Sequence, residues 1–421
     1  MSPLDHLATT VPALPERIAL LEAWATALAA DADGLASAIT QATGKPIRLS
    51  RSEVSRTVAT VRSTAAAAPV LDCRLVELPG SCAEVHQVPV GPALAVTPFN
   101  FPLNLAVHKL APAILAGCPV VWKPSPKAPG VAERALAAWT AAGGPAGLVT
   151  VAHASDAEVA AMLRDPRLRL LSFTGSAAVG ARLHALAASA RVRTVLELGG
   201  NAAVILHRTN HLPAVAAAVA EGACAHAGQV CISVQRIFAP GRRADWTDAL
   251  VAAFRAVPSG DPQDERTLCG PVIDDAAAAR IQGLLERLRA AGGRFLTGGT
   301  WQGRVLAPTL IAGVPANHPD VREQEFFAPI ATLHPYADPD EALYAAEDTP
   351  FGLNAGLFTD DEALVQRAFR WLDVGTLVIN DVPTRRDDGL PYGGMKGSGH
   401  GREGGASGVR EYVAEKVLWR C

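Results

Sequence analysis

The residues of this chain most able to do chemistry are Cys231, within residues 228–233, and Glu197, within residues 196–201. A cysteine thiolate is a strong nucleophile, and a carboxylate that can move a proton allows a covalent intermediate on that cysteine to turn over. Neither residue is persuasive alone. A lone cysteine is usually a small buried hydrophobic side chain, and a glutamate before Gly-Gly often just ends a strand. Other motifs in the chain support a catalytic role for the two residues together.

An asparagine in a third run, residues 97–102, could supply an oxyanion donor. Asn100 stands before Phe101 and Pro102, and proline suits the first turn of a helix. An amide placed against a carbon under nucleophilic attack stabilises the developing negative oxygen, and such donors contribute about 3 kcal/mol in other enzymes. The alternative is a turn or capping asparagine, the usual role of this residue. The surrounding motifs favour the catalytic interpretation.

A fourth run, residues 173–180, follows a predicted strand and opens a predicted helix. Glycines at such a turn let the backbone approach a pyrophosphate, and the helix N-terminus offers free N–H groups to it. The spacing is not Gly-x-Gly-x-x-Gly, so the bare pattern would describe a plain strand-helix turn equally well. Gly175, Ser176 and Gly180 are the candidate cofactor contacts in this run.

The patterns between these motifs predict an α/β protein. Amphipathic patterns predict helices over residues 15–45 and 52–66, and alternating runs on either side of Pro-Gly-Ser predict a hairpin over residues 74–88. Short apolar strands then alternate with alanine-rich helices, which is typical of a parallel sheet covered by helices. We expect two α/β domains with a cleft between them, with strands at residues 93–96, 120–122, 148–151, 168–173, 202–206 and 376–380.

Composition excludes several classes of protein. With 421 residues, 49% of them hydrophobic, the chain is long enough for two or three domains. A net charge of -3 leaves no electrostatic footprint for nucleic acid. No apolar run reaches the ~20 residues of a membrane span, and the start lacks the features of a signal peptide, so we expect a cytoplasmic protein. The seven cysteines lack CxxC or CxxH spacing, so we expect neither a metal site nor a disulfide framework.

In order and separation, the four runs resemble the aldehyde dehydrogenase superfamily, and the resemblance extends from about Pro12 to Cys421. A Gly-rich block at residues 391–403 matches the C-terminal signature of that family. The resemblance implies an aldehyde dehydrogenase-like α/β fold with a Rossmann-like cofactor domain, a catalytic domain and a small oligomerisation sheet, in a homodimer or homotetramer. The implied boundaries are residues 1–72 and 91–199 for the dinucleotide-binding domain, 200–404 for the catalytic domain, and 73–90 and 405–421 for the oligomerisation strands.

The resemblance also implies roles for the motif residues. Cys231 would attack an aldehyde, Asn100 and the Cys231 backbone N–H would hold the oxyanion, and Glu197 would activate the hydrolytic water. The cofactor would be NAD or NADP, because the glutamate that often follows Lys123 by three residues, and holds the ribose hydroxyls, is Pro126 here. Residues 324–329 resemble the Glu-x-Phe-Gly-Pro element of the family, which contacts the nicotinamide end. The implied cofactor contacts are Lys123, Ser125, Gly175, Ser176, Gly180, Glu325 and Phe327.

Two local features point to a class of aldehyde. Asn104 and His108 lie four and eight residues after the predicted oxyanion donor, on one face of the helix, and Arg385 and Arg386 lie in the loop that borders the channel mouth of the family. The runs around them resemble the lactaldehyde, phosphonoacetaldehyde and non-phosphorylating glyceraldehyde-3-phosphate dehydrogenase group. Because arginine suits a phosphate, phosphonate or carboxylate, a small anionic aldehyde is one interpretation. The other, equally weighted, is a packed core histidine with solvated arginines.

Two further functions stay open at this point. A CoA-acylating aldehyde dehydrogenase generally does without the base, so Glu197 speaks against that branch. A non-catalytic binding or structural protein on the same scaffold is the other alternative. Family members usually begin with several dozen more residues, and the shortened start could alter oligomer contacts or expose an edge of the cofactor domain.

Overall fold

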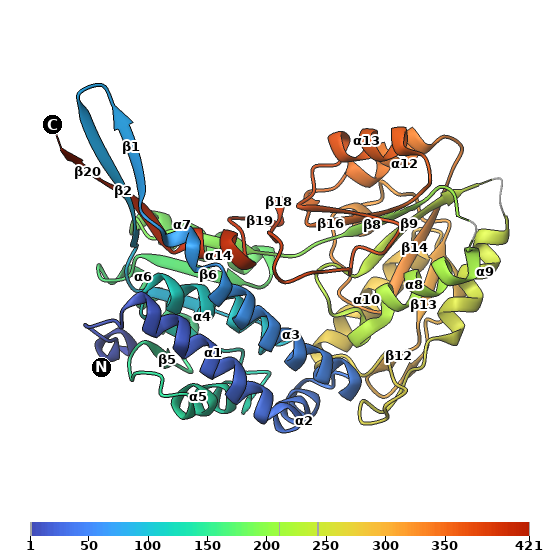
Figure 1. The fold of residues 1–421 in the computed structure, drawn as a ribbon. Coiled ribbons are helices and arrows are strands. Elements are labelled where there is room, and N and C mark those ends of the chain that lie inside the picture. The colour runs from blue at the N-terminus through green and yellow to red at the C-terminus, as the bar shows by residue number, and fades with distance from the viewer. Residues whose placement is uncertain (1, 210, 242–243, 421) are drawn as a thin grey trace.

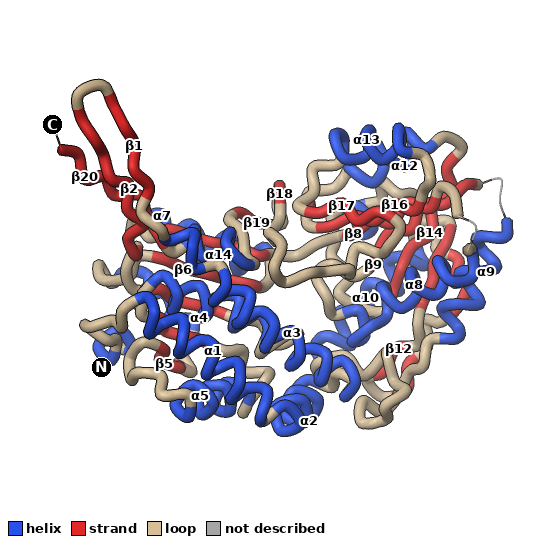
Figure 2. The backbone as a smooth tube through the Cα atoms, viewed as in Figure 1, coloured by secondary structure: helices blue, strands red, loops and turns tan. Residues whose placement is uncertain are grey.

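The structure is a computed structural model that describes residues 2–209, 211–241 and 244–420. Figure 1 shows two lobes, the first built mainly from the N-terminal half of the chain, with a long ribbon of β1, β2 and β20 projecting from it. In each lobe helices lie outside a sheet, as the colours of Figure 2 show. Among the described residues, no helix is both long and apolar enough to cross a membrane.

The first lobe is built on a six-stranded sheet whose central strands are buried on both faces. Along β3 (Ala93–Val96), Ala93 and Ala95 pack into the core under one set of helices, whereas Leu94 and Val96 face the opposite core. This arrangement explains the continuous apolar runs, because a parallel strand covered on both sides has no polar face. The sheet order is β19 (Gly399–His400), β7 (Arg193–Glu197), β6 (Leu170–Thr174), β3, β4 (Val120–Lys123), β5 (Val149–Val151).

Helices α1 to α7 belong to this lobe, and most of them cover the sheet. The expected helix over residues 15–45 is divided at Asp31, and the second helix begins five residues earlier than its pattern predicts. The bounds are α1 (Leu14–Ala30), α2 (Ala32–Thr43), α3 (Ile47–Ala66), α4 (Asn104–Ala116), α5 (Val131–Ala141), α6 (Asp156–Arg164) and α7 (Ala177–Ser189), with 3-10 turns at η1 (Pro3–His6) and η2 (Ala68–Leu71).

The second lobe is built on a seven-stranded sheet in which β10 alone pairs antiparallel with its neighbour. Its strands, in sheet order, are β10 (Arg294–Thr297), β13 (Thr309–Ala312), β14 (Ile330–Tyr336), β9 (Val234–Pro240), β8 (Ala202–Leu206), β16 (Asn354–Phe358) and β17 (Thr376–Ile379). The helices of this lobe are α8 (Leu212–Cys224), α9 (Ala244–Ala256), α10 (Asp275–Ala290), α11 (Pro319–Arg322), α12 (Pro339–Glu347) and α13 (Glu362–Trp371), with η3 (Ala225–Gly228) after α8.

The projecting ribbon is a three-stranded antiparallel sheet of β1 (Arg74–Leu78), β2 (Ser81–Pro89) and β20 (Val413–Arg420). Large apolar side chains lie exposed on it, including Leu75, Val417 and Trp419. Two small pairs, β11 (Trp301–Gln302) with β12 (Val305–Leu306) and β15 (Phe351–Gly352) with β18 (Met395–Lys396), complete the strands.

Two C-terminal segments pack against the first lobe, although the boundaries expected from the sequence assign them to other parts of the protein. Strand β19, within the range expected for the catalytic domain, pairs with β7 of the first sheet, where Gly399 stands opposite Glu197. Helix α14 (Gly405–Glu411), within the range expected for the oligomerisation strands, packs against α3 and α4. Both follow from the chain crossing back to the first lobe after β18. That crossing brings the Gly-rich C-terminal block against the end of β7.

A buried arginine links three parts of the second lobe. Arg236 on β9 is 1% exposed, and its guanidinium donates to the backbone carbonyl oxygens of Asn201 at 3.0 and 3.2 Å, of Ala345 at 2.9 Å and of Ala346 at 2.9 Å. Each of these carbonyls would lose its donor if the guanidinium were removed. Burial lowers the pKa of Arg236 to about 10, which leaves the group charged at neutral pH.

We expect Arg236→Met to lower the free energy of unfolding by at least about 3 kcal/mol, because the variant leaves buried carbonyl groups without donors. Urea unfolding followed by circular dichroism measures this, with Arg255→Met, at an exposed position of α9, as the matched control. If both variants lowered the free energy of unfolding by the same small amount, the hydrogen bonds of Arg236 would not contribute to stability.

Candidate active site

The backbone brings Cys231 close to the end of the first sheet. Cys231 lies in the turn between η3 and β9, and a Cβ placed on Gly200 would overlap its carbonyl oxygen. Only a glycine permits this approach. The Sγ atom of Cys231 lies 3.4 Å from the Oη atom of Tyr392. Burial raises the pKa of the Cys231 thiol to about 11, an effect that the contact with Tyr392 opposes.

The predicted oxyanion donor lies beside the same turn. Asn100 is buried, and its Nδ2 atom donates to the backbone carbonyl oxygen of Gln229 at 2.9 Å, two residues before Cys231. The side chain of Gln229 is held in turn, because its Oε1 atom accepts a hydrogen bond from the Ile273 N–H at 2.8 Å. A side-chain amide carries two N–H groups, so one remains for an oxygen that forms next to the thiol.

Glu197 ends β7 and is 3% exposed. Neither of its carboxylate oxygens has a hydrogen-bond partner among the described residues. Burial raises its pKa well above the usual value, and the nearby carboxylate of Glu403 raises it further. Glu403 is itself paired with Lys109 at 2.6 Å. A buried carboxyl group without a partner has the environment of a general base or acid rather than of a structural ion pair.

The predicted phosphate turn lines a cavity of about 400 Å³ in the first lobe, with Lys123, Ser125, Gly175 and Ser176 among its walls. Ser176 is the N-cap of α7, and no side chain caps that helix end. A Cβ on Gly175 would clash with the Phe173 ring. These observations fit a dinucleotide whose pyrophosphate approaches the backbone and the free N–H groups of α7. The residues present are therefore suited to hold NAD or NADP.

Three of the predicted cofactor residues lie outside the walls of that cavity. Gly180 lies on α7 against Leu198, where a Cβ would clash. Glu325 accepts a hydrogen bond from the Gly200 N–H at 3.3 Å, and burial raises its pKa to about 7. Phe327 packs edge-to-face on Phe99, with ring centroids 6.1 Å apart. Glu325 contacts the turn that approaches Cys231, where the reactive end of a dinucleotide would have to reach.

A second cavity, of about 160 Å³, contains the nucleophile and has several charged walls. Lys45 forms a buried pair with Glu53 at 2.5 Å and lies 3.5 Å from the centroid of the Phe101 ring. Arg56 and Arg386 contribute two more positive charges. The charged, aromatic and other reactive or hydrogen-bonding side chains in these walls include Lys45, Glu53, Arg56, Phe101, Asn104, His226, Cys231, Arg386 and Tyr392.

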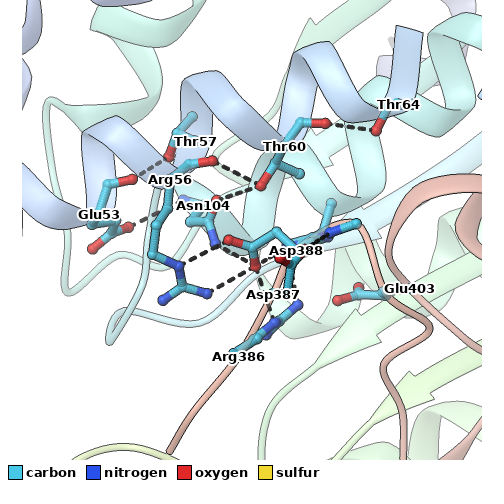
Figure 3. Close-up of polar contacts among 12 residues, drawn as sticks. Glu53, Arg56, Thr57, Thr60, Thr64, Asn104, Arg386, Asp387, Asp388 and Glu403 are labelled. Carbon is cyan, nitrogen blue, oxygen red and sulfur yellow. Dashed lines mark hydrogen bonds and ion pairs between the residues drawn. The ribbon is translucent and has the colours of Figure 1, made fainter. Parts of the chain in front are cut away.

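The buried carboxylate of Asp388 holds the two arginines (Figure 3). Arg56 donates to it at 2.9 and 2.8 Å, and Arg386 lies 3.1 Å from its Oδ1 atom. The Nε2 atom of His108 lies 3.0 Å from the same oxygen and 2.9 Å from Arg386. The pKa of Asp388 is well below its usual range, because these hydrogen bonds and charges outweigh its burial. Burial lowers the pKa of His108, followed by the charge of Arg386, so the imidazole is neutral.

The structure separates the predicted substrate residues into three groups. Asn104 and Arg386 line the cavity of Cys231. His108 is buried behind it, in contact with Arg386 and Asp388. Arg385 is exposed, lies 3.8 Å from Asp381 and is not among the cavity walls.

Sequence reasoning missed several side chains of this site, among them Lys45, Arg56, Asp388 and Tyr392. Arg56 lies in a helix whose pattern is ordinarily amphipathic, and Tyr392 lies in a block interpreted as structural. Asp388 had one available indication. An arginine at a channel needs a counter-charge, and Asp388 follows Arg386 by two residues.

Known proteins resemble this chain over most of its length. It is 34% identical over 411 residues to the 3-sulfolactaldehyde dehydrogenase of Priestia aryabhattai, covering 96% of this chain and 86% of that protein. It is 33% identical over 413 residues to the lactaldehyde dehydrogenase of Methanococcus maripaludis, with 96% and 87% covered.

Solved structures agree in fold. Aldehyde dehydrogenase 21 from Physcomitrella patens, in complex with the reaction product succinate, superposes with a TM-score of 0.92 at 34% identity, covering 97% of this chain and 86% of that one. Glyceraldehyde-3-phosphate dehydrogenase GapN from Methanocaldococcus jannaschii, complexed with NADP, superposes with a TM-score of 0.91 at 30% identity. The superposition covers 97% of this chain and 90% of that one. The aldehyde dehydrogenase family model matches residues 9–418, and the chain therefore belongs to the aldehyde dehydrogenase family.

Proposed function

We propose that this NAD(P)-dependent aldehyde dehydrogenase oxidises a small aldehyde with an anionic tail to the carboxylic acid, through a thioester on Cys231. The observation that carries the substrate class is the charge around the cavity of Cys231. Lys45, Arg56 and Arg386 oppose only Glu53 in its walls, and Asp388 behind them supplies one further negative charge. One positive charge is left over to meet an anion.

In the proposed reaction the Cys231 thiolate attacks the aldehyde carbon, and the oxygen that becomes negative is held by Asn100 and the Cys231 backbone N–H. NAD or NADP, when bound, supplies the hydride acceptor that converts the thiohemiacetal to the thioester. Glu197 then takes a proton from the water that attacks the thioester, which releases the acid and returns the thiol. The carboxylate of Glu197, which has no hydrogen-bond partner among the described residues, supports hydrolysis of the thioester rather than transfer of its acyl group to CoA. The presence of a nucleophile, an oxyanion donor and a base supports an enzyme rather than a non-catalytic protein.

The names of related proteins agree with an anionic substrate. Relatives are named for 3-sulfolactaldehyde and sulfoacetaldehyde, and a structural neighbour is named for glyceraldehyde-3-phosphate. Each of these aldehydes is small and carries a sulfonate or a phosphate. The cavity volume of about 160 Å³ is in keeping with a substrate of that size.

The proposed cofactor is NAD or NADP. Lys127, the cation next to Pro126, pairs with Asp274 at 2.6 Å and is not among the walls of the cofactor cavity. The cytoplasmic location expected from the sequence also stays a prediction.

We also propose the projecting sheet of β1, β2 and β20 as the contact between subunits of a homodimer or homotetramer. Its exposed Leu75, Val417 and Trp419 would be costly to leave in water and would be covered by a second copy.

We expect Cys231→Ala to abolish aldehyde oxidation and to leave cofactor binding unchanged, because no thiohemiacetal can form without the thiolate. Reduction of NAD or NADP, measured by absorbance with an aldehyde panel, and cofactor titration by fluorescence would check both parts. Cys224→Ala, at a buried cysteine outside the cavity walls, is the matched control. Near-normal turnover in Cys231→Ala would rule out the assigned nucleophile.

In Glu197→Gln, thioester formation should survive better than hydrolysis, because the variant lacks only the base for water. Rapid mixing should then show a burst of reduced cofactor, close to one per active site, before a steady state at least about tenfold slower. Loss of the burst together with the steady state would instead mean that Glu197 acts earlier, on the thiol itself.

We expect Arg56→Gln to lower kcat/KM for a phosphorylated or carboxylated aldehyde by roughly tenfold or more, because a charge-assisted contact is lost. The kcat/KM for a neutral aldehyde should change little. Arg385→Gln is the matched control, since this arginine is exposed and lies outside the cavity walls, so its loss should affect both substrates equally and slightly. Equal losses for charged and neutral aldehydes in Arg56→Gln would remove the anion-binding role and leave the dehydrogenase activity as it stands.

A further inference from the structure

Tyr392 touches the reacting atom of the proposed mechanism and has no role in it so far. Its Oη atom lies 3.4 Å from Cys231 Sγ, within hydrogen-bond distance for sulfur. The side chain is 5% exposed and lines the cavity of the nucleophile. The two glycines that follow it, Gly393 and Gly394, are closely packed, which constrains the backbone next to the tyrosine.

A cation lies directly over the tyrosine ring. The guanidinium carbon of Arg386 is 3.7 Å from the ring centroid. Arg386 also contacts Asp388 at 3.1 Å and His108 at 2.9 Å, and it belongs to the cluster in Figure 3. A cation over an aromatic face is attracted by the ring, and its field makes the phenolic O–H a stronger hydrogen-bond donor.

The charged groups facing Cys231 explain why such a donor is needed. The carboxyl groups of Glu325 and Glu197 both raise the pKa of the thiol, and burial raises it more than either. Opposing them are the hydrogen bond from Tyr392 and the charge of Arg386. A buried thiol between two carboxyl groups needs a compensating contact to react as a thiolate at neutral pH.

We propose that Tyr392 is a catalytic residue that donates a hydrogen bond from its hydroxyl to the Cys231 thiolate, with Arg386 as the positioning residue that holds and polarises its ring. The thiol proton leaves to solvent, and the phenol keeps its own proton throughout, since burial holds the pKa of Tyr392 well above its usual value. No bond to Tyr392 forms or breaks. The role rests on the proposed function only in naming Cys231 as the nucleophile.

The rate of alkylation of Cys231 by iodoacetamide, measured against pH in the free enzyme, tests this without aldehyde or cofactor. Mass spectrometry of the labelled peptide separates Cys231 from the exposed Cys73 and Cys82. In Tyr392→Phe the midpoint should rise by about one pH unit, and alkylation below it should slow roughly threefold to tenfold. Tyr412→Phe, at a buried tyrosine outside the cavity walls, should leave the midpoint and the basal activity unchanged.

A second variant keeps the test decisive if Tyr392→Phe folds poorly. Arg386→Lys retains a positive charge but lacks the planar group that stacks on the ring, so its midpoint should rise by a smaller amount. The kcat/KM profile of Tyr392→Phe should shift on its acidic side by the same amount as alkylation. An unchanged alkylation midpoint in both variants would overturn the role of Tyr392. Dehydrogenase activity in those variants would then still support the proposed function, so the two failures are distinguishable.

Discussion

The carboxylate of Asp388 holds the substrate side of the active site together, because three separate segments of the chain depend on its single charge. Arg56 comes from α3, His108 from α4 and Arg386 from the loop before the Gly-rich block. Bringing two guanidinium groups together in a partly buried site is costly unless a carboxylate compensates them. With one carboxylate for two arginines, the compensation is incomplete, and the remainder favours an anion in the cavity.

The other side of the nucleophile carries two buried carboxyl groups. Glu197 ends β7 and Glu325 lies in the loop before β14, and burial raises the pKa of each. The thiol therefore lies between a positive substrate pocket and two buried carboxyl groups with a strong tendency to hold protons. This polarity suits a reaction in which negative charge first develops next to the sulfur and a proton is later withdrawn from water.

Local sequence motifs revealed the site residues that lie at the ends of strands. The order of strands along the chain determines where such residues lie in the fold. The loops after β3, β6 and β7 meet at one edge of a parallel sheet, so the sequence alone could indicate that Asn100, Ser176 and Glu197 lie near a common cleft. Arg56 and Asp388, separated by 332 residues, could not be paired in this way. Nor could Arg385 be told from Arg386, since adjacent residues in an irregular loop share no periodicity, and here only the second faces the cavity.

The second carboxylate near Glu197 explains how its protonation can be controlled without touching the substrate. Lys109 pairs with Glu403 at 2.6 Å, so Glu403 remains charged, and its pKa is lowered although it is buried. That fixed negative charge raises the proton affinity of Glu197, which has no ion pair of its own among the described residues. A base that must accept a proton from water benefits from a raised proton affinity, since a carboxylate in a direct salt bridge would accept protons poorly. The charge of Glu403 thus acts on Glu197 through its field, and the charge of Lys109 partly opposes it.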